Sequence, residues 1–483
     1  MKKQVLALLC ILLLFIPSAH AAIGANAVWE IRATTGSDTN SGGFVAGSTG
    51  TDYSQQASPQ YSLTGLTTAA ASATIATTSA SADMVGNIIN ITGGTLFLTG
   101  WYQIVSVVVG TSITVDRAAT SGIGAAGTAN IGGALKTINK VATVLVASNI
   151  AYVKAEATYT TAANITFSPG NILPSSSSPA TRIVGYTSTR GDAGRATLKA
   201  TAGSVTLMYA NSDGISIENF ILDGNSQSSS TGIINGGSHY TRVQNCLIKG
   251  WSNSGINLAG GSGEVIFNEI TGGSGGSALL IGGANLITYN CIHDNVSIGI
   301  NSSAYSTICY NILANNSGST NDGILIATFT GPVIHNTIHK SGRHGIFNSV
   351  TYAAGINYQN NILSSNGGYG IKGGSAAGIP ASLGYDGNAY YNNTSGTRNN
   401  MDDTTVNPQN GVAPYTNIYD QILTADPFVA KASNDYRLNQ NPGGGAACRG
   451  SAVPSLYPGL TNPNSYAFPD MGAVQHQDPG FAY

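Results

Sequence analysis

The sequence predicts an all-β protein whose central part is a parallel β-solenoid of about ten coils. The first observation is a repeat between residues 213 and 393, in which an asparagine within alternating apolar residues recurs every twenty-odd residues. The second is that each unit alternates with period two between clusters of Gly, Asn and Ser, without the apolar stripe of a helix. The third is a column half a period away, where Gly or Ala precedes Ile233, Ile256, Leu279, Ile300, Ile324, Ile346 and Ile371.

The asparagines of the repeat are expected to point inward, because each shares a face with the Ile or Leu two residues on. A buried amide is costly unless it is hydrogen-bonded, but amides stacked at a strand spacing of ~4.8 Å can bond one another. We therefore predict an asparagine ladder. Its expected members are Asn219, Asn245, Asn268, Asn290, Asn311, Asn336 and one of Asn360 and Asn361, with a weaker match at Asn388.

The composition agrees with a long solenoid. Only 9% of the residues are charged and the net charge is −2, so no basic nucleic-acid-binding surface is expected. The apolar content of 42% argues against disorder. A solenoid also explains how 483 residues can be packed without one very large core, since it extends its core in one dimension.

The chain is expected to be exported. Met1–Ala21 has the features of a bacterial-type signal peptide: Lys2 and Lys3, then an apolar run, then an Ala-His-Ala cleavage site that ends at Ala21. No later segment resembles a membrane span, so we expect a secreted, periplasmic or cell-surface protein without an integral membrane segment. The four remaining cysteines show no zinc spacing and are not expected to form a disulfide framework.

Four regions are predicted along the chain. The signal peptide, 1–21, precedes an N-terminal β-rich module at 22–133, in which residues 28–32, 87–92, 101–109 and 112–116 have the pattern of strands. The solenoid follows at 134–400. It begins with a helix at 134–146, whose apolar stripe would cover the open end of the coils. Residues 401–483 are assigned to a C-terminal cap.

The repeat resembles the right-handed parallel β-helix (PbH1-type) repeats of the pectate-lyase-like superfamily, also called the pectin lyase fold. Segments at Leu135–Lys140, Arg182–Asp192 and Asp470–Val474 resemble the cap helix, first regular coils and terminal cap of secreted members. The resemblance covers residues 135–475. It implies a right-handed parallel β-helix and extracellular polysaccharide as the partner.

The resemblance also implies what a known active site of this superfamily would contain. Its pectate lyases hold Ca²⁺ with clustered acids, and its polygalacturonases carry paired aspartates and a Gly-His-Gly element. Neither set is complete here: the chain offers only Arg343-His344-Gly345 and, outside the repeat, Asp402-Asp403. By alignment of the coils, Asp223 shares a column with Lys249, Gly272, Asp294, Asn315 and Lys340, so the acids are dispersed. No metal site is predicted, the cofactor stays unknown, and Ca²⁺ is implied only if the chain is a lyase.

A candidate catalytic group comes from the glycine–isoleucine column. Alignment on it places Asn321 beside Arg343 and Asp322 beside His344, with the last two Cα atoms ~5 Å apart. Asp322, Arg343 and His344 could bind an acidic sugar and move a proton, with Asn321 contacting the substrate. The alternative is a surface ion pair or a hydrogen bond between coils.

A second column predicts further substrate-binding residues on the outward face. It holds His293 and His339, separated by Ala314 and therefore ~10 Å apart. Asp294 and Lys340 follow them at the turn, and Lys340 is included among the candidates. The alternative is that both histidines have structural roles.

Two functions stay open. The first is a polysaccharide lyase or glycoside hydrolase that acts on acidic glycans. The second is a non-catalytic glycan-binding adhesin, matrix component or fibre-like structural protein. The oligomeric state and the role of residues 22–133 are not predicted.

Overall fold

The computed structural model describes residues 23–24, 26–170, 180–237, 240–328, 331–350, 357–374, 387–399, 419–452 and 469–474. The predicted signal peptide lies outside the described residues, as does much of the predicted C-terminal region. The described chain forms two compact units. One contains the residues up to Lys136 together with Ser148–Ile150, and the other contains Thr137–Ala147 and the residues from Ala151 onward. No helix in the described part of the chain is long and apolar enough to cross a bilayer.

The first unit contains a closed barrel of six antiparallel strands in the order β3-β4-β7-β6-β5-β8. This barrel lies within the predicted N-terminal β-rich module at 22–133. The strands predicted near residues 87, 101 and 112 are β5, β6 and β7, whereas β3, β4 and β8 lie in Ala-, Ser- and Thr-rich sequence that gave no strand signal. Leu63, Leu66 and Ile75 on β3 and β4 complete the core. The strands of this unit are β1 (Ala27–Arg32), β2 (Gly43–Val45), β3 (Tyr61–Thr68), β4 (Thr74–Ala76), β5 (Ile88–Phe97), β6 (Gly100–Val108), β7 (Ser112–Val115) and β8 (Thr120–Ile131).

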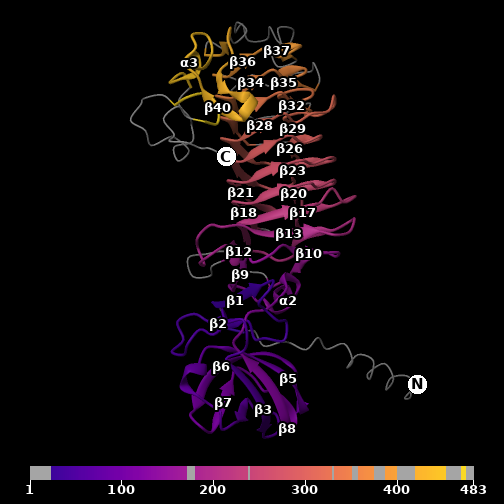
Figure 1. The fold of residues 1–483 in the computed structure, drawn as a ribbon. Helices are drawn as coiled ribbons and strands as arrows, with labels where there is room; N and C mark the ends of the chain where they lie inside the picture. Colours follow the sequence, from indigo (N-terminus) through magenta and orange to yellow (C-terminus); the bar gives the residue numbers. More distant parts are fainter. Residues whose placement is uncertain are drawn as a thin grey trace, which may run out of the picture. The chain divides into compact units, whose positions relative to one another are not determined.

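The second unit is a parallel β-solenoid with three sheets, and Figure 1 shows its strands stacked coil upon coil. Sheet I contains β9 (Ile150–Lys154), β12 (Thr181–Tyr186), β15 (Ile215–Glu218), β18 (Tyr240–Gln244), β21 (Ser262–Ile266), β24 (Asn285–Thr288), β27 (Thr307–Cys309), β30 (Val333–Ile334) and β33 (Tyr358–Gln359). Sheet II contains β10 (Tyr159–Thr161), β13 (Ala196–Ala200), β16 (Phe220–Asp223), β19 (Leu247–Lys249), β22 (Glu269–Thr271), β25 (Cys291–His293), β28 (Ile312–Ala314), β31 (Thr337–His339), β34 (Ile362–Ser364), β36 (Ala389–Tyr391) and β38 (Gln421–Ile422). Sheet III contains β11 (Thr166–Phe167), β14 (Thr206–Ala210), β17 (Thr231–Asn235), β20 (Ser254–Leu258), β23 (Ser277–Ile281), β26 (Ile298–Ser302), β29 (Ile324–Ile326), β32 (Ile346–Asn348), β35 (Tyr369–Gly373) and β37 (Gly396–Asn399).

The predicted glycine–isoleucine column lies in sheet III. Ile233, Ile256, Leu279, Ile300, Ile324, Ile346 and Ile371 are successive register partners, and all are fully buried. The preceding glycines have a steric cause. A Cβ at Gly299 would lie 2.5 Å from the carbonyl oxygen of Gly323, so neighbouring coils approach too closely here for most side chains.

The asparagine ladder is present from Asn268 to Asn388. The backbone N–H and the side-chain Nδ2 of one asparagine both donate to Oδ1 of the asparagine one coil later, at 2.9–3.1 Å. The other Nδ2 hydrogen goes to a carbonyl oxygen of sheet I, as from Asn290 to Val265 at 2.8 Å. Asp420 ends the ladder by accepting the N–H of Asn388 at 2.8 Å. Every buried amide in this row therefore has partners. The ladder is formed by Asn268, Asn290, Asn311, Asn336, Asn361 and Asn388.

Two predicted members of the ladder, Asn219 and Asn245, lie outside it. They occupy the corner position directly before the ladder, with φ of 62° and 52°, and Asn360 does the same at 60°. Cys246 takes the ladder position of its coil and donates its N–H to Oδ1 of Asn268 at 2.9 Å. The prediction was wrong by one residue because asparagine is suited to both the corner position and the ladder position. It adopts left-handed backbone readily, and its amide can also form the hydrogen bonds of the ladder.

A second asparagine row lies between sheets II and III and was not predicted. Asn295 Nδ2 donates to Asn316 Oδ1 at 3.0 Å, and Asn366 Nδ2 donates to Asn393 Oδ1 at 2.8 Å. Ser341 stands between these two pairs. Its N–H donates to Asn366 Oδ1, but its buried Oγ has no hydrogen-bond partner among the described residues. The row is therefore interrupted at one coil.

The helix predicted at 134–146 is shorter than expected. Helix α2 spans Ile138–Val144, with Thr137 as its N-cap accepting the Lys140 N–H at 3.1 Å, and it contacts β11. The helix begins at Ile138 and not at 134, because Leu135 forms a β-bridge with Ile31 and donates its N–H to the Glu30 carbonyl. The backbone of Leu135 is thus used before a helix can begin.

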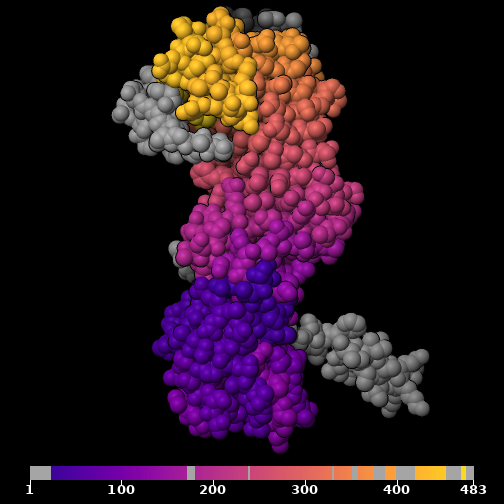
Figure 2. Space-filling model, in the orientation of Figure 1, coloured from indigo at the N-terminus to yellow at the C-terminus, as the bar shows by residue number. Residues whose placement is uncertain are grey.

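The C-terminal segment folds back over the outer face of sheet II. Its elements are β39 (Phe428–Ala430), β40 (Asp435–Leu438) and the short helix α3 (Gly445–Cys448). Phe428, Tyr436 and Met471 share one apolar cluster with Ile312 and Ile362, which point outward from sheet II. In Figures 1 and 2 this segment, in yellow, lies against the orange coils. Sheet II consequently has two buried faces in its later coils.

The ladder predicts a large effect of one amide. Asn311→Ala leaves the N–H and Nδ2 of Asn290 without their acceptor, and each buried unsatisfied group costs about 1–3 kcal/mol. We expect the free energy of unfolding to fall by about 3 kcal/mol, measured by urea titration. Asn301→Ala is the control, because Asn301 lies half-buried on the outer face of β26, and it should change stability by less than about 0.5 kcal/mol. Equal losses in both variants would contradict a stabilising ladder.

Candidate functional site

The predicted catalytic group Asp322, Arg343 and His344 lies at the turns that lead into β29 and β32. Asp322 is fully buried, and the guanidinium of Arg343 binds both its oxygens, Nε to Oδ1 at 2.9 Å and Nη2 to Oδ2 at 2.5 Å. The backbone N–H of Arg343 donates to the carbonyl of Asn321, whose side chain turns away to the Ser317 carbonyl. Burial raises the pKa of the Asp322 carboxyl, although Arg343 and the His344 N–H favour its charged form. The carboxylate is thus held in an ion pair.

The imidazole of His344 does not bond to Asp322; only its backbone N–H does, at 3.2 Å. Nδ1 instead accepts the backbone N–H of Tyr369 at 3.0 Å. Burial and the nearby charges of Lys372 and Arg343 lower the pKa of His344 to about 4. The ring is therefore neutral at neutral pH and carries its proton on Nε2, where it can donate a hydrogen bond.

Two aromatic rings and a second cation adjoin this group. The guanidinium carbon of Arg343 lies 4.6 Å from the centroid of the Phe347 ring, and Lys372 Nζ lies 5.8 Å from that of Tyr369. Phe347 and Lys372 are register partners on neighbouring strands. All four side chains are partly exposed, with 34% of the Arg343 side chain accessible. We call Arg343, Phe347, Tyr369 and Lys372 the Arg343 face. Lys372 was not predicted from the sequence, because its neighbours come from other coils.

The other predicted residues lie on sheet II. The strand register places Asp223, Lys249, Thr271, His293, Ala314 and His339 in one column. The predicted column contained Gly272, Asp294, Asn315 and Lys340 in place of the last four residues. It was therefore wrong by one residue from Thr271 onward. His293 bridges two carboxylates, Nε2 to Glu269 at 3.3 Å and Nδ1 to Asp294 at 2.8 Å. The Glu269 and Asp294 contacts raise the pKa of His293, with Glu269 the larger cause.

His339 is outward in register but buried by the C-terminal segment. Only 4% of it is exposed, and its ring packs against Phe428 and Tyr436, with centroids 5.7 and 5.8 Å away. Burial lowers the pKa of His339 to about 4. A substrate therefore has no access to this imidazole. Lys340, the next residue, is exposed at the turn with a φ of 57°.

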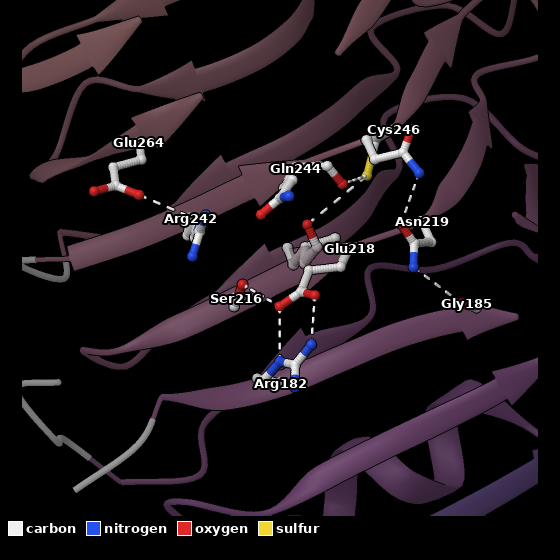
Figure 3. Close-up of polar contacts among 11 residues, drawn as sticks. Arg182, Gly185, Ser216, Glu218, Asn219, Arg242, Gln244, Cys246 and Glu264 are labelled. Carbon is white, nitrogen blue, oxygen red and sulfur yellow. Dashed lines mark hydrogen bonds and ion pairs between the residues drawn. The ribbon is translucent and has the colours of Figure 1, made fainter. Parts of the chain in front are cut away.

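A set of ion pairs on sheet I was missed from the sequence. Figure 3 shows Arg182 bound to both oxygens of Glu218, at 2.8 and 2.6 Å, and Arg242 directed at Glu264, 3.3 Å away. These residues lie on consecutive strands, so alignment of the sheet I strands could have found them. Because each charge already has an opposite partner, we assign this cluster to stability of the early coils.

The residues do not fit the Ca²⁺ site that a lyase of the resembled superfamily would need. In the part of the chain that the structure describes, no group of three or more His, Cys, Asp or Glu side chains is placed to hold a metal. Asp322 has both oxygens bound to Arg343, and the Glu269 and Asp294 carboxylates are engaged by His293. We derive no step through a metal ion.

Comparisons with known proteins agree with this architecture. A family model described as a right-handed beta helix region matches residues 205–353. Pectate lyase Pel9A superposes with a TM-score of 0.51 at 14% identity, over 71% of this chain and 91% of that chain. The chain resembles the right-handed parallel β-helix proteins. A comparison with curated protein sequences finds no match.

Two further solved structures superpose less closely on this right-handed β-helix. ORF18 of Geobacillus virus E2 gives a TM-score of 0.30 at 14% identity, over 55% of this chain and 58% of that chain. The pectin methylesterase from Aspergillus niger gives a TM-score of 0.29 at 14% identity, over 61% of this chain and 88% of that chain. At these identities the likeness concerns the fold alone.

The buried ion pair can be tested by its stability. Arg343→Ala leaves the Asp322 carboxylate buried without its partner, which costs about 3 kcal/mol, the lower end for such pairs because Arg343 is one-third exposed. Asp322→Asn keeps the shape and an acceptor for the His344 N–H. In that background, the same Arg343→Ala change should cost less than half as much, as measured by urea unfolding. Equal costs in both backgrounds would show that the pair contributes no coupling.

The histidines beneath the C-terminal segment predict acid sensitivity. Burial lowers the pKa of both His335 and His339 to about 4, so the unfolded state binds protons first as the pH falls through about 6.5. Above about pH 6.5 these two histidines do not weaken the fold. As the pH falls from about 6.5 to 4, they lower the free energy of unfolding progressively. The charges nearest His339 are Lys431, Asp426 and Lys340. His339→Leu should lose less stability than the wild type between pH 7 and 5 in thermal unfolding; an unchanged pH dependence would contradict this.

Proposed function

We propose that the chain is an exported right-handed β-helix protein that binds an acidic polysaccharide through the Arg343 face. The observation that carries the proposal is a pair of cations beside two aromatic rings on one lateral face. This combination is notable in a chain with only 9% charged residues. With Asp322 included, the local charge is positive, whereas the whole chain carries −2.

The side chains of this face match the chemistry of a uronic acid. Nη1 of Arg343 has no hydrogen-bond partner within the described residues, and the guanidinium is oriented by Asp322 on one side and by Phe347 beneath it. Lys372 forms no ion pair with any described carboxylate. Both cations can therefore bind a sugar carboxylate, while the exposed parts of the Phe347 and Tyr369 rings can contact apolar C–H groups of the sugar.

The same geometry favours binding over proton abstraction. Asp322 is fully buried and held by Arg343, and Nδ1 of His344 is occupied by an N–H, so neither group is available as a base in this arrangement. One observation favours the second candidate, cleavage by a lyase or hydrolase: Arg343 and Lys372 lie near His344, whose Nε2–H could donate a hydrogen bond to a leaving oxygen if the ring, only 7% exposed here, became accessible. An adhesin or matrix protein corresponds to binding without cleavage.

Binding can be measured by calorimetry with polygalacturonate, using fully methyl-esterified pectin as the uncharged match. We expect the wild type to bind the first more tightly, and binding to weaken as salt increases. Lys372→Ala should weaken it about fivefold, corresponding to roughly 1 kcal/mol. Lys199→Ala, which removes a lysine from β13 of sheet II, should leave affinity unchanged. Equal binding of both polymers by the wild type would contradict the proposal.

The same preparations test for cleavage. Ultraviolet absorbance of unsaturated uronates reports a lyase, and reducing ends report a hydrolase, with and without Ca²⁺. Turnover that is lost in His344→Gln while binding is kept would establish the second candidate. Binding without turnover would establish the binding protein.

A further inference from the structure

Four rings stack at the corner between sheets I and II. Successive centroids of Phe267, Tyr289, Tyr310 and His335 lie 5.2, 5.2 and 4.9 Å apart, with interplanar angles of 13°, 13° and 8°. Each residue has left-handed backbone, with φ between 54° and 58°, and directly precedes a ladder asparagine. The asparagine ladder therefore sets the spacing of the rings.

The stack is closed at one end and open at the other. His335 is fully buried, and its Nδ1 lies 3.1 Å from the carbonyl oxygen of Asp470 in the C-terminal segment. Phe267, in contrast, is 41% exposed, the only phenylalanine or tryptophan that is exposed in the described part of the chain. One of its faces is covered by Tyr289, so the exposure comes from the rest of the ring.

The coil next to that open face carries polar groups in place of a ring. Asn245 holds the corner position there, and Arg195 binds it twice, Nη2 to Oδ1 at 2.8 Å and Nε to the carbonyl at 2.9 Å. A guanidinium and an amide thus stand at the end of the stack. Neither group blocks Phe267 from solvent, as its exposed fraction shows.

Two carboxylates lie on sheet II beyond this corner: Glu269 at the start of β22, next to the corner, and Asp294 at the opposite turn, after β25. Glu269 follows Phe267 after the buried Asn268, with 30% of its side chain accessible, and Asp294 of the next coil is 51% accessible. His293 holds both carboxylates by bridging them. The bond from His293, with the nearby charge of Arg195 contributing, lowers the pKa of Glu269, so this carboxylate is ionised at neutral pH.

We propose that Phe267, Glu269 and Arg195 form a binding site for a neutral pyranose unit of a polysaccharide, separate from the Arg343 face. A pyranose presents an apolar C–H face and a rim of hydroxyl groups. The exposed part of the Phe267 ring matches the first, and an oriented carboxylate that accepts, with a guanidinium that donates, matches the second. The charges of Glu269 and Arg195 offset each other, so the site has no net positive charge to attract a sugar carboxylate. It differs in this from the Arg343 face, where the local charge is positive.

The test is native affinity electrophoresis of the full chain in gels that contain a neutral polysaccharide: dextran, laminarin, galactomannan or xylan. Wild type should be retarded by at least one of them. Phe267→Ala should weaken that binding about tenfold, since it removes the stacking surface, and Phe267→Tyr should retain it. Glu269→Gln should weaken it while leaving Phe267 in place. Tyr305→Ala, which removes another exposed aromatic ring, is the matched control and should bind as the wild type does.

Two controls make the outcome decisive. Unchanged thermal unfolding of Phe267→Ala would show that its lost binding is not lost folding, and Glu269→Gln supplies an independent variant should that one be destabilised. Retention by polygalacturonate is measured in parallel and should be unchanged in both variants, which separates this site from the Arg343 face. No retardation of the wild type by any neutral polymer would overturn the inference, and so would wild-type binding by both variants.

Discussion

One side-chain amide per coil, bonded to the amide of the next coil, is the constraint on which the second unit depends. From Asn290 to Asn388 each Oδ1 accepts the backbone N–H and a side-chain N–H of the asparagine one coil before it, so neighbouring coils cannot slide without breaking two buried hydrogen bonds. The ladder also fixes the corner. Each asparagine is preceded by a left-handed residue that points outward, and this places Phe267, Tyr289, Tyr310 and His335 in one line.

Much of the solenoid can be predicted from local sequence, and the errors of that prediction in the coils have one physical source. The glycine–isoleucine column was predicted without a slip, because glycine is needed where coils approach and isoleucine is needed in the core. The asparagine column slipped at Asn219 and Asn245, because left-handed backbone and inward amide bonding both select asparagine at adjacent positions. The alternation of apolar residues is compatible with an asparagine at the corner position or at the ladder position. Only the contacts with neighbouring coils distinguish the two. In the barrel, β3 and β8 were missed because small residues form their strands with few apolar anchors.

The functional surfaces were harder to predict than the coils, since exposure depends on distant sequence. Alignment placed Arg343 beside Asn321, but it could not show that Asp322 is buried or that Nδ1 of His344 is used by Tyr369. Lys372 belongs to the same face but was not predicted, because it lies in the neighbouring coil. His339 has the outward register expected for a ligand-binding residue, yet Phe428 and Tyr436 cover it. Register is thus a property of the repeat, whereas accessibility is decided elsewhere in the chain.

The folded-back C-terminal segment has a consequence for biosynthesis. Coil-to-coil bonds of the ladder join residues 21–27 positions apart, so the coils can stack while the chain is still being made. The bond between His335 and Asp470 spans 135 positions, and the outward Ile312 and Ile362 receive their cover from the same late segment. A nascent chain therefore passes through a stage in which the solenoid is assembled but a stripe of apolar side chains faces solvent. Such a stage is prone to self-association, and its duration is set by the synthesis of the last residues.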